Sequence, residues 1–125
     1  MQRDFIDLRI RAEVLELCDD HDGAEKLRAL SLEIAREVDL TCYGYQLLWR
    51  NRVNEAIRLL EYNASKHPDS WNAWDSLGEA FSHGGDLRRA VECYGHASRL
   101  VEDEQERLRI ECTLRDLVAL GAIAS

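Results

Sequence analysis

Apolar side chains recur at intervals of three and four residues through most of this 125-residue chain. That spacing places them on one face of an α-helix, which turns once in about 3.6 residues. Residues 24–38 and 104–120 each carry one such stripe. Residues 2–18 carry two stripes that together make a wide apolar face, Phe5, Leu8, Ala12 and Leu15 beside Ile6, Ile10, Val14 and Leu17. The pattern predicts about seven helices and no strand.

Polar turns with glycine or asparagine separate the predicted helices. Residues 19–23 form the first turn, and Gly121 is placed to end the last helix. Asn51 stands where a left-handed backbone is needed, and asparagine is the usual second choice after glycine for that geometry. In the corresponding turn further along, residues 84–85 are glycines that stop one helix, and Asp86 can cap the next.

The one proline, Pro68, marks a boundary between two helix pairs. Proline cannot continue a helix, and it disfavours helical geometry at His67. Asp69 or Ser70 can then cap the helix that follows. With one proline and seven glycines, the chain has few of the residues that build the many tight turns of an all-β sandwich.

The chain repeats itself with a period of 34 residues, since Gly44 aligns with Gly78 (78 − 44 = 34). Small residues fall on small ones, and large apolar residues fall on large apolar ones. The other pairs at this offset are Leu47 and Phe81, Ala56 and Ala90, Ile57 and Val91, and Leu60 and Tyr94. Glycine and alanine let two helices approach closely, and the large residues fill the space beside the contact. The period is typical of a helical repeat protein.

Residues 71–104 resemble a tetratricopeptide repeat, whose pattern is W-x-x-L-G-x-x-Y followed by an alanine, an aromatic residue and an alanine. The matching residues are Trp74, Leu77, Gly78, Phe81, Ala90, Tyr94 and Ala97. Residues 39–70 resemble a degenerate copy, in which the fitting residues are Gly44, Leu47, Ala56, Leu60 and Pro68. Residues 44–80 are also similar to bacterial repeat pairs that are often appended to serine-hydrolase domains.

This resemblance implies an all-α fold in which antiparallel helix pairs stack into a right-handed superhelix. We expect a single domain over residues 1–125. Its parts are an N-terminal helical hairpin (1–38), a degenerate repeat (39–70), a clear repeat (71–104) and a C-terminal capping helix (105–121). Helical arrays need end caps with a polar outer face, and the excess of acidic residues near both chain ends fits that need.

The resemblance also implies a concave groove lined by the first helix of each repeat. The groove positions are Thr41, Tyr45, Leu48 and Trp49 in the first copy and Asn72, Asp75, Ser76, Glu79, Ser82 and His83 in the second. Tyr45 and Trp49 are candidates to anchor a peptide or another subunit, although Trp49 packing on the N-terminal hairpin is an alternative.

A basic clamp for a carboxylate is not expected in this groove. Folds of the family that this chain resembles can hold a C-terminal carboxylate in a clamp of lysine, arginine and asparagine. The resemblance places those positions at Thr41, Tyr45 and Ser76, none of them basic. Asp75 and Glu79 instead suit a basic or amine-bearing partner.

Charge and hydropathy narrow the classes of partner and compartment. The net charge of −8 argues against a general nucleic-acid binder, which needs a basic surface. No run of apolar residues reaches the length of a membrane span, and the first residues lack the apolar core of a secretory signal. We therefore expect a cytoplasmic protein that binds neither nucleic acid nor membrane.

The four cysteines are expected to be buried free thiols, because each lies within an apolar helical pattern; two disulfides are the alternative. They are Cys18, Cys42, Cys93 and Cys112, and no two have a metal-ligand spacing. The histidines are equally scattered, so we predict no metal site and no cofactor. Ser76 does not stand in the G-x-S-x-G motif of a hydrolase nucleophile, and the Gly84–Gly85 turn has no preceding strand to make a phosphate loop.

These observations favour a protein-interaction module or adaptor without enzymatic activity. Its contact surface is either the groove or the apolar face of the N-terminal helix, and self-association is possible through either. Two alternatives are open: an accessory or regulatory subunit of a separately encoded enzyme such as a serine hydrolase, and a stand-alone enzyme on a helical scaffold.

Overall fold

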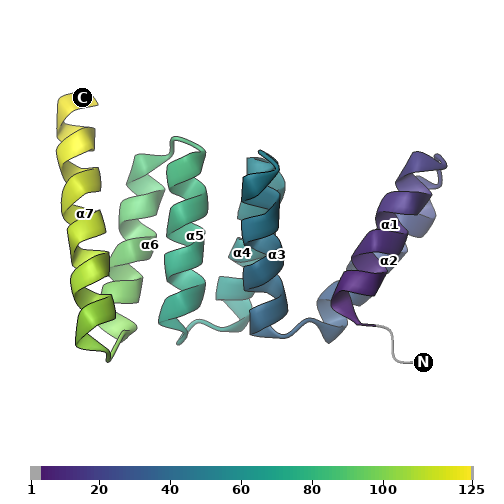
Figure 1. The fold of residues 1–125 in the computed structure, drawn as a ribbon, viewed down its shortest axis with the longest axis horizontal. Helices are drawn as coiled ribbons and strands as arrows, with labels where there is room; N and C mark the ends of the chain where they lie inside the picture. Colours follow the sequence, from purple (N-terminus) through teal and green to yellow (C-terminus); the bar gives the residue numbers. More distant parts are fainter. Residues whose placement is uncertain (1–3, 125) are drawn as a thin grey trace. The chain divides into compact units, whose positions relative to one another are not determined.

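Helices make up nearly all of the described chain, which comprises residues 4–124 in the computed structural model, with side chains as far as Gly121 (Figure 1). Seven helices lie in these residues, and no strand does. They are α1 (Phe5–Leu17), α2 (His21–Ile34), α3 (Glu37–Trp49), α4 (Val53–Lys66), α5 (Trp71–His83), α6 (Leu87–Leu100) and α7 (Glu104–Ala124). The predicted all-α helical repeat fold is confirmed.

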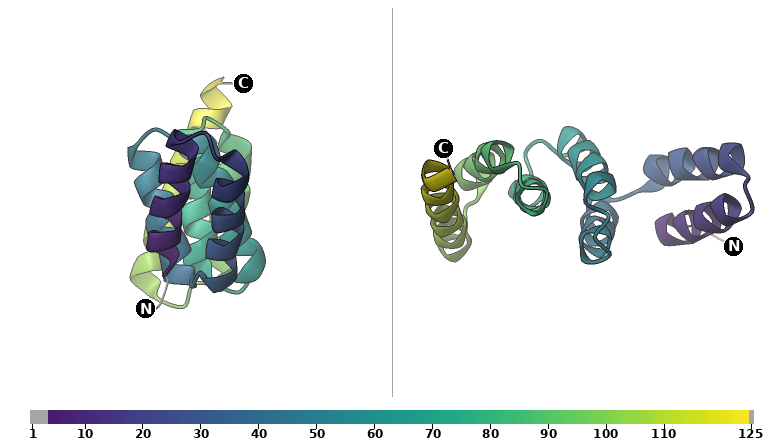
Figure 2. Two further views of the ribbon diagram at one scale, coloured as in Figure 1. Left: turned by 90° about the vertical axis from the view of Figure 1, so that its right-hand side faces the viewer. Right: turned by 90° about the horizontal axis from the view of Figure 1, so that it is seen from above.

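The chain divides into two compact units, Met1–Asp39 and Leu40–Ser125. The first unit contains the hairpin of α1 and α2, which run side by side in the right-hand view of Figure 2. The second contains the helices from α3 to α7, apart from the first turn of α3. The boundary lies one residue beyond the predicted end of the hairpin. The prediction that a single domain covers both units stays a prediction.

Local sequence signals account for most helix ends. The side-chain oxygen of Ser70 accepts a hydrogen bond from the Ala73 N–H (3.2 Å), so Ser70 rather than Asp69 caps α5. Asp86 caps α6 in the same way through the Arg89 N–H (3.2 Å). Asn51 has the predicted left-handed backbone, with φ of 61°. These caps satisfy backbone N–H groups that have no partner inside the helix.

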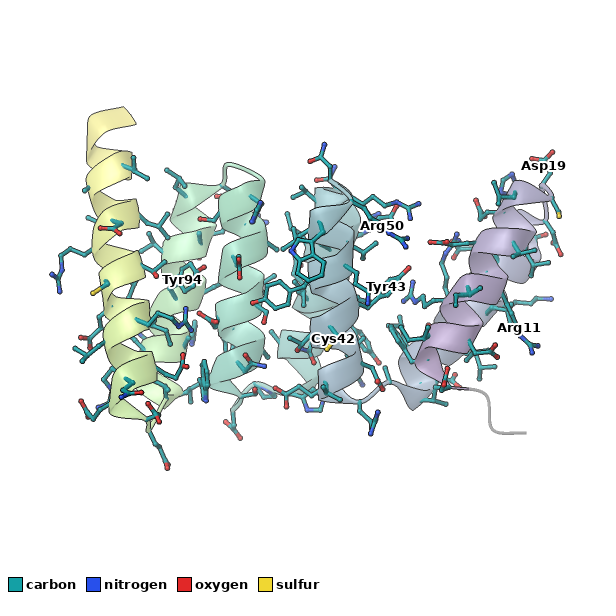
Figure 3. All side chains as sticks on the ribbon, in the orientation of Figure 1. Arg11, Asp19, Cys42, Tyr43, Arg50 and Tyr94 are labelled. Atoms are coloured by element: carbon teal, nitrogen blue, oxygen red, sulfur yellow. The ribbon has the colours of Figure 1, made fainter. Side chains whose placement is uncertain are left out.

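Three predicted helix boundaries are wrong. The helix expected over residues 24–38 ends at Ile34, and α3 already begins at Glu37. The turn expected over residues 19–23 is shorter, because Asp20 caps a helix that already begins at His21. Asp19 instead supplies the left-handed residue of that turn, with φ of 61° (labelled in Figure 3). Gly121 does not end the last helix, which continues to Ala124. A glycine lowers helix stability without forbidding helical geometry, so a single glycine need not stop a helix.

The first unit buries only one of the two apolar stripes of α1. Phe5, Leu8 and Ala12 are at most 2% exposed. The second stripe faces solvent, with exposed fractions of 40% for Ile6, 56% for Ile10, 52% for Val14 and 86% for Leu17. One whole side of α1 is therefore apolar and exposed, and the expectation that this hairpin is a polar-faced end cap stays a prediction. The same helix also carries the exposed Asp7–Arg11 ion pair (3.1 Å).

The second unit is held together by close helix pairs that recur with the predicted period. Both helices of the first pair begin 34 residues before their counterparts (71 − 37 and 87 − 53). A Cβ added at Gly44 would lie 2.6 Å from the Leu60 side chain, and one at Gly78 would lie 3.0 Å from the Tyr94 ring. Helix α5 packs on both α4 and α6, and α7 packs on α6. In Figure 1, α4 and α6 lie behind α3 and α5.

Most residues of the repeat signature lie in the core of the second unit, as expected from packing, whereas Trp74 is half-buried and Pro68 is exposed. Ala56, Leu60, Ala90 and Ala97 are fully buried. Leu47, Leu77, Phe81 and Tyr94 are at most 5% exposed. The Pro68 carbonyl accepts a hydrogen bond from the Trp74 indole N–H (2.9 Å), which ties the turn before α5 to that helix.

The cysteine prediction is correct in one respect and wrong in another. All four thiols are free, but only Cys93 is buried. Cys18, Cys42 and Cys112 are exposed. Cys18 follows the last residue of α1 as its C-cap, and Cys42 lies on the outer side of α3. An apolar pattern around a residue does not fix which face that residue occupies, and a small thiol costs little in water.

Candidate functional site

Helix α5 brings the predicted polar groove residues together. Capped by Ser70, it runs between α4 and α6 and presents Asp75, Ser76 and Glu79 within one turn. Tyr45 reaches these residues from α3, because its hydroxyl is influenced by both Ser76 and Glu79. We call this surface the α3–α5 face, comprising Tyr45, Trp49, Asp75, Ser76 and Glu79.

Asp75 is the most buried charged residue of this face. Its side chain is 9% exposed, and its Oδ2 accepts a hydrogen bond from Nη2 of Arg109 on α7 (3.0 Å). Burial raises the pKa of the Asp75 carboxyl, while the Arg109 guanidinium opposes that rise. Oδ1 of Asp75 is buried and has no hydrogen-bond partner within the chain. Arg109 therefore satisfies only Oδ2 of Asp75, and Oδ1 stays without a hydrogen bond inside the chain.

Arg109 itself is shared between two carboxylates. Its Nε donates to Oε2 of Glu106 (2.9 Å), one turn earlier on α7. Its side chain is 47% exposed, so it joins α5 to α7 from the solvent side. Arg109 was not among the predicted site residues. The sequence held no direct signal for this pair: Arg109 lies one repeat period after Asp75, but a period marks equivalent positions and does not predict a contact.

Tyr45 is a half-buried phenol in an acidic setting. Burial raises its pKa to about 12, hydrogen bonding to Ser76 opposes that rise, and the charges of Glu79 and Asp75 add to it. The hydroxyl of Ser76 donates to the Asn72 carbonyl (2.9 Å), and Ser76 is fully buried. The Tyr45 hydroxyl therefore stays protonated at neutral pH, and Ser76 serves local hydrogen bonding.

The remaining predicted groove residues differ in how much surface they offer. Thr41 is 8% exposed and its hydroxyl accepts from Nδ2 of Asn63 on α4 (3.3 Å), and Leu48 is 7% exposed. Both side chains are buried in the helix packing, so they offer almost no surface to a partner. Trp49 is 81% exposed, His83 is exposed, and Asn72 and Ser82 are half-buried.

Comparison with known proteins found one informative similarity. Over 63 residues the chain is 30% identical to "Tetratricopeptide repeat protein 30 homolog" of Caenorhabditis briggsae. The aligned stretch amounts to 50% of this chain and 10% of that protein, so the chain spans about a tenth of this relative. No family model matches. The similarity and the helical architecture together fit a protein of the tetratricopeptide-repeat type.

No three His, Cys, Asp or Glu side chains among residues 4–121 are grouped to hold a metal ion. None of the helices described is both long and apolar enough to cross a bilayer. The α3–α5 face places exposed and half-buried aromatic side chains beside carboxylates.

Proposed function

We propose that this chain is a protein-interaction module without enzymatic activity, which binds a protein partner through the α3–α5 face. The observation that carries the proposal is Trp49, which is 81% exposed and one helical turn from Tyr45 on the same side of α3. Exposed tryptophan is costly in water, and tryptophan and tyrosine are the side chains most enriched at the energetic centre of interfaces.

The charge of the face supports a partner segment with a basic group. Asp75 is already paired with Arg109, whereas Glu79 is half-buried and adds its negative charge beside Tyr45. A lysine or arginine near the partner's contact to Trp49 would meet Glu79. A carboxylate-terminated segment would be repelled there by Glu79, and Tyr45, at a position where a clamp would need a basic residue, offers no positive charge to hold it.

Selection from a displayed peptide library tests this function. Peptides selected by the full chain are expected to lose at least about tenfold in affinity for Trp49→Ala, because truncating an aromatic anchor typically costs more than about 1.4 kcal/mol. The matched control is Leu120→Ala, which removes a side chain that is 54% exposed at the far end of α7. Peptides that bind both variants equally well would contradict the proposal, as would the recovery of no binding peptide.

A second contact surface is proposed from the exposed stripe of α1, Ile6, Ile10, Val14 and Leu17. Four apolar side chains on one side of a helix suit the packing of a second helix, and a second copy of this chain can supply it. Sedimentation at increasing concentration is expected to show self-association that Ile10→Asp abolishes. Ile34→Asp on α2, at a residue 42% exposed, is the control. A monomer at every concentration would remove this surface.

The alternative role as an accessory subunit of a separately encoded enzyme stays a prediction, as does the cytoplasmic location. Capture of partners from the native host, followed by mass spectrometry, separates an enzyme partner from other proteins.

A further inference from the structure

A cavity of about 320 Å³ lies on the other layer of the second unit, between α4, α5 and α6. An apolar cavity of about 150 Å³ is enough to admit benzene, and ligand sites commonly begin at about 300 Å³. The cavity is therefore large enough for an apolar side chain and part of its backbone. It shares no lining residue with the α3–α5 face.

The inner wall of the cavity is formed by buried apolar side chains. Leu77 and Cys93 on this wall are at most 5% exposed, as is Phe81. The ring of Trp74 stacks on the ring of His96, with centroids 4.5 Å apart. The indole N–H of Trp74 already donates a hydrogen bond to the Pro68 carbonyl. A wall without unsatisfied polar atoms favours an apolar occupant, because a polar one would lose its hydrogen bonds with water.

The rim of the cavity is acidic. Glu61 comes from α4 and Glu92 from α6. Glu92 already pairs with Arg88 one turn earlier (3.8 Å), and the lining cation, Arg89, lies 3.6 Å from Asp86, which leaves Glu61 as the rim carboxylate for a partner. The guanidinium of Arg89 also lies over the Phe81 ring, 5.6 Å from its centroid. Arg89 is thus engaged with its own helix cap and with the wall.

The Cys93 thiol lies on the cavity wall, buried and near the rim carboxylates. Burial is the main cause that raises the pKa of Cys93 to about 12, and the charges of Glu92 and Glu61 come next, ahead of the opposing effect of Arg89. A cation that enters the rim is therefore attracted, and an anion is repelled.

We propose that this cavity is a second partner-binding site, which receives an apolar side chain of a protein segment and pairs an adjacent lysine or arginine of that segment with Glu61. The site is independent of the α3–α5 face, so either can fail alone. Two features together would select the partner segment: the apolar wall binds its apolar side chain, and the rim carboxylate binds its cation.

Three capped peptides of equal length test this site on the full chain. One alternates leucine with lysine, the second alternates alanine with lysine, and the third alternates leucine with glutamate. Calorimetry is expected to show binding of the first and at least about tenfold weaker binding of the other two, since one lost the apolar group and one the cation. Binding of the alanine–lysine peptide as tight as that of the leucine–lysine peptide would overturn the proposal.

Nuclear magnetic resonance locates the peptide. The indole N–H of Trp74 and the amide of Cys93 are expected to shift on titration with the leucine–lysine peptide, while the amides of Tyr45 and Ser76 stay in place. Shifts confined to the α3–α5 face would refute the second site. Shifts of Trp74 that depend on the concentration of the free chain would mean that a second copy fills the cavity, which also refutes it.

A matched pair of charge reversals tests whether binding depends on the rim carboxylate or only on the net negative charge of the chain. Glu61→Lys and Glu111→Lys change the net charge equally, and both glutamates are exposed, one at the rim and the other on α7. We expect Glu61→Lys to weaken binding at least about fivefold and Glu111→Lys to change it less than about twofold. Equal losses would show a general attraction between opposite charges and would overturn the proposal.

Discussion

Replacing Gly44 by alanine tests whether close helix contact is what the 34-residue period encodes. The added Cβ would lie 2.6 Å from Cδ2 and 2.7 Å from Cγ of Leu60, which is fully buried. At Gly78, the same change would place a Cβ 3.0 Å from the Tyr94 ring. Both contacts are tighter than normal packing, and the neighbours are core residues that have no room to retreat.

The expected magnitude is the difference between two opposing effects. Alanine in place of a helical glycine stabilises by about 1 kcal/mol, and overpacking a core costs about 1–3 kcal/mol. At Gly44, where the overlap is severe, we expect a net loss of about 2 kcal/mol, with a smaller loss at Gly78. Gly95, inside α6, has only Nη1 of Arg99 within reach, at 3.7 Å. Gly95→Ala should therefore gain about 1 kcal/mol.

Urea unfolding followed by tryptophan fluorescence measures this difference in the relevant part of the chain. All three tryptophans, Trp49, Trp71 and Trp74, belong to the second unit, as do the three glycines. The free energy of unfolding is compared at unchanged urea dependence, so that only stability differs. If Gly44→Ala proved as stable as Gly95→Ala, the packing explanation of the repeat would be refuted.

Three further predictions concern the ion pair, the exposed aromatic residue and the thiols. Arg109→Ala should lower the free energy of unfolding by about 1–2 kcal/mol at pH 7, because it leaves Asp75 buried and unpaired. Since the folded-state pKa of Asp75 is raised, the loss relative to the parent chain should shrink as the pH falls through that pKa and the carboxyl becomes neutral. Trp49→Ala should change stability by less than about 0.5 kcal/mol in urea unfolding, because the side chain is 81% exposed. In a thiol titration, the three exposed cysteines should react in the folded chain and Cys93 only after unfolding, because it is buried with its pKa raised to about 12.

Each of these three predictions has an outcome that would contradict the structural reason given for it. A loss at Arg109→Ala that is the same at pH 7 and pH 4 would mean that the charge of Asp75 is not its cause. A strong destabilisation by Trp49→Ala would make Trp49 a packing residue. A fourth thiol that reacts as fast as the others would place Cys93 at the surface.

Short-range sequence signals were sufficient for the helices and for the paired packing between them. The left-handed Asn51, the Ser70 and Asp86 caps and the break at Pro68 depend on a few neighbouring residues, so their chemistry can be read locally. The buried contact of Gly78 with Tyr94 was also foreseeable, because the 34-residue period aligns it with Gly44 and Leu60. Gly121 failed as a helix stop because a glycine permits an ending without requiring one.

The site was foreseeable only in part, for a reason that lies in the packing. Tyr45, Asp75 and Glu79 do come together, but the partner that fixes Asp75 is Arg109, from a helix predicted only as a cap. A pairing between helices depends on how the helices approach, and periodicity within one helix carries no information on that approach.

By itself, the amino-acid sequence determined the helices, their caps and the small-on-large contacts of the repeat, because each follows from spacing along the chain. Only the tertiary structure decided which apolar stripe of α1 faces solvent, which cysteine is buried, and that an apolar cavity with an acidic rim opens between α4 and α6. The physical reason is that spacing fixes which residues share a face, whereas burial depends on what the neighbouring helices cover.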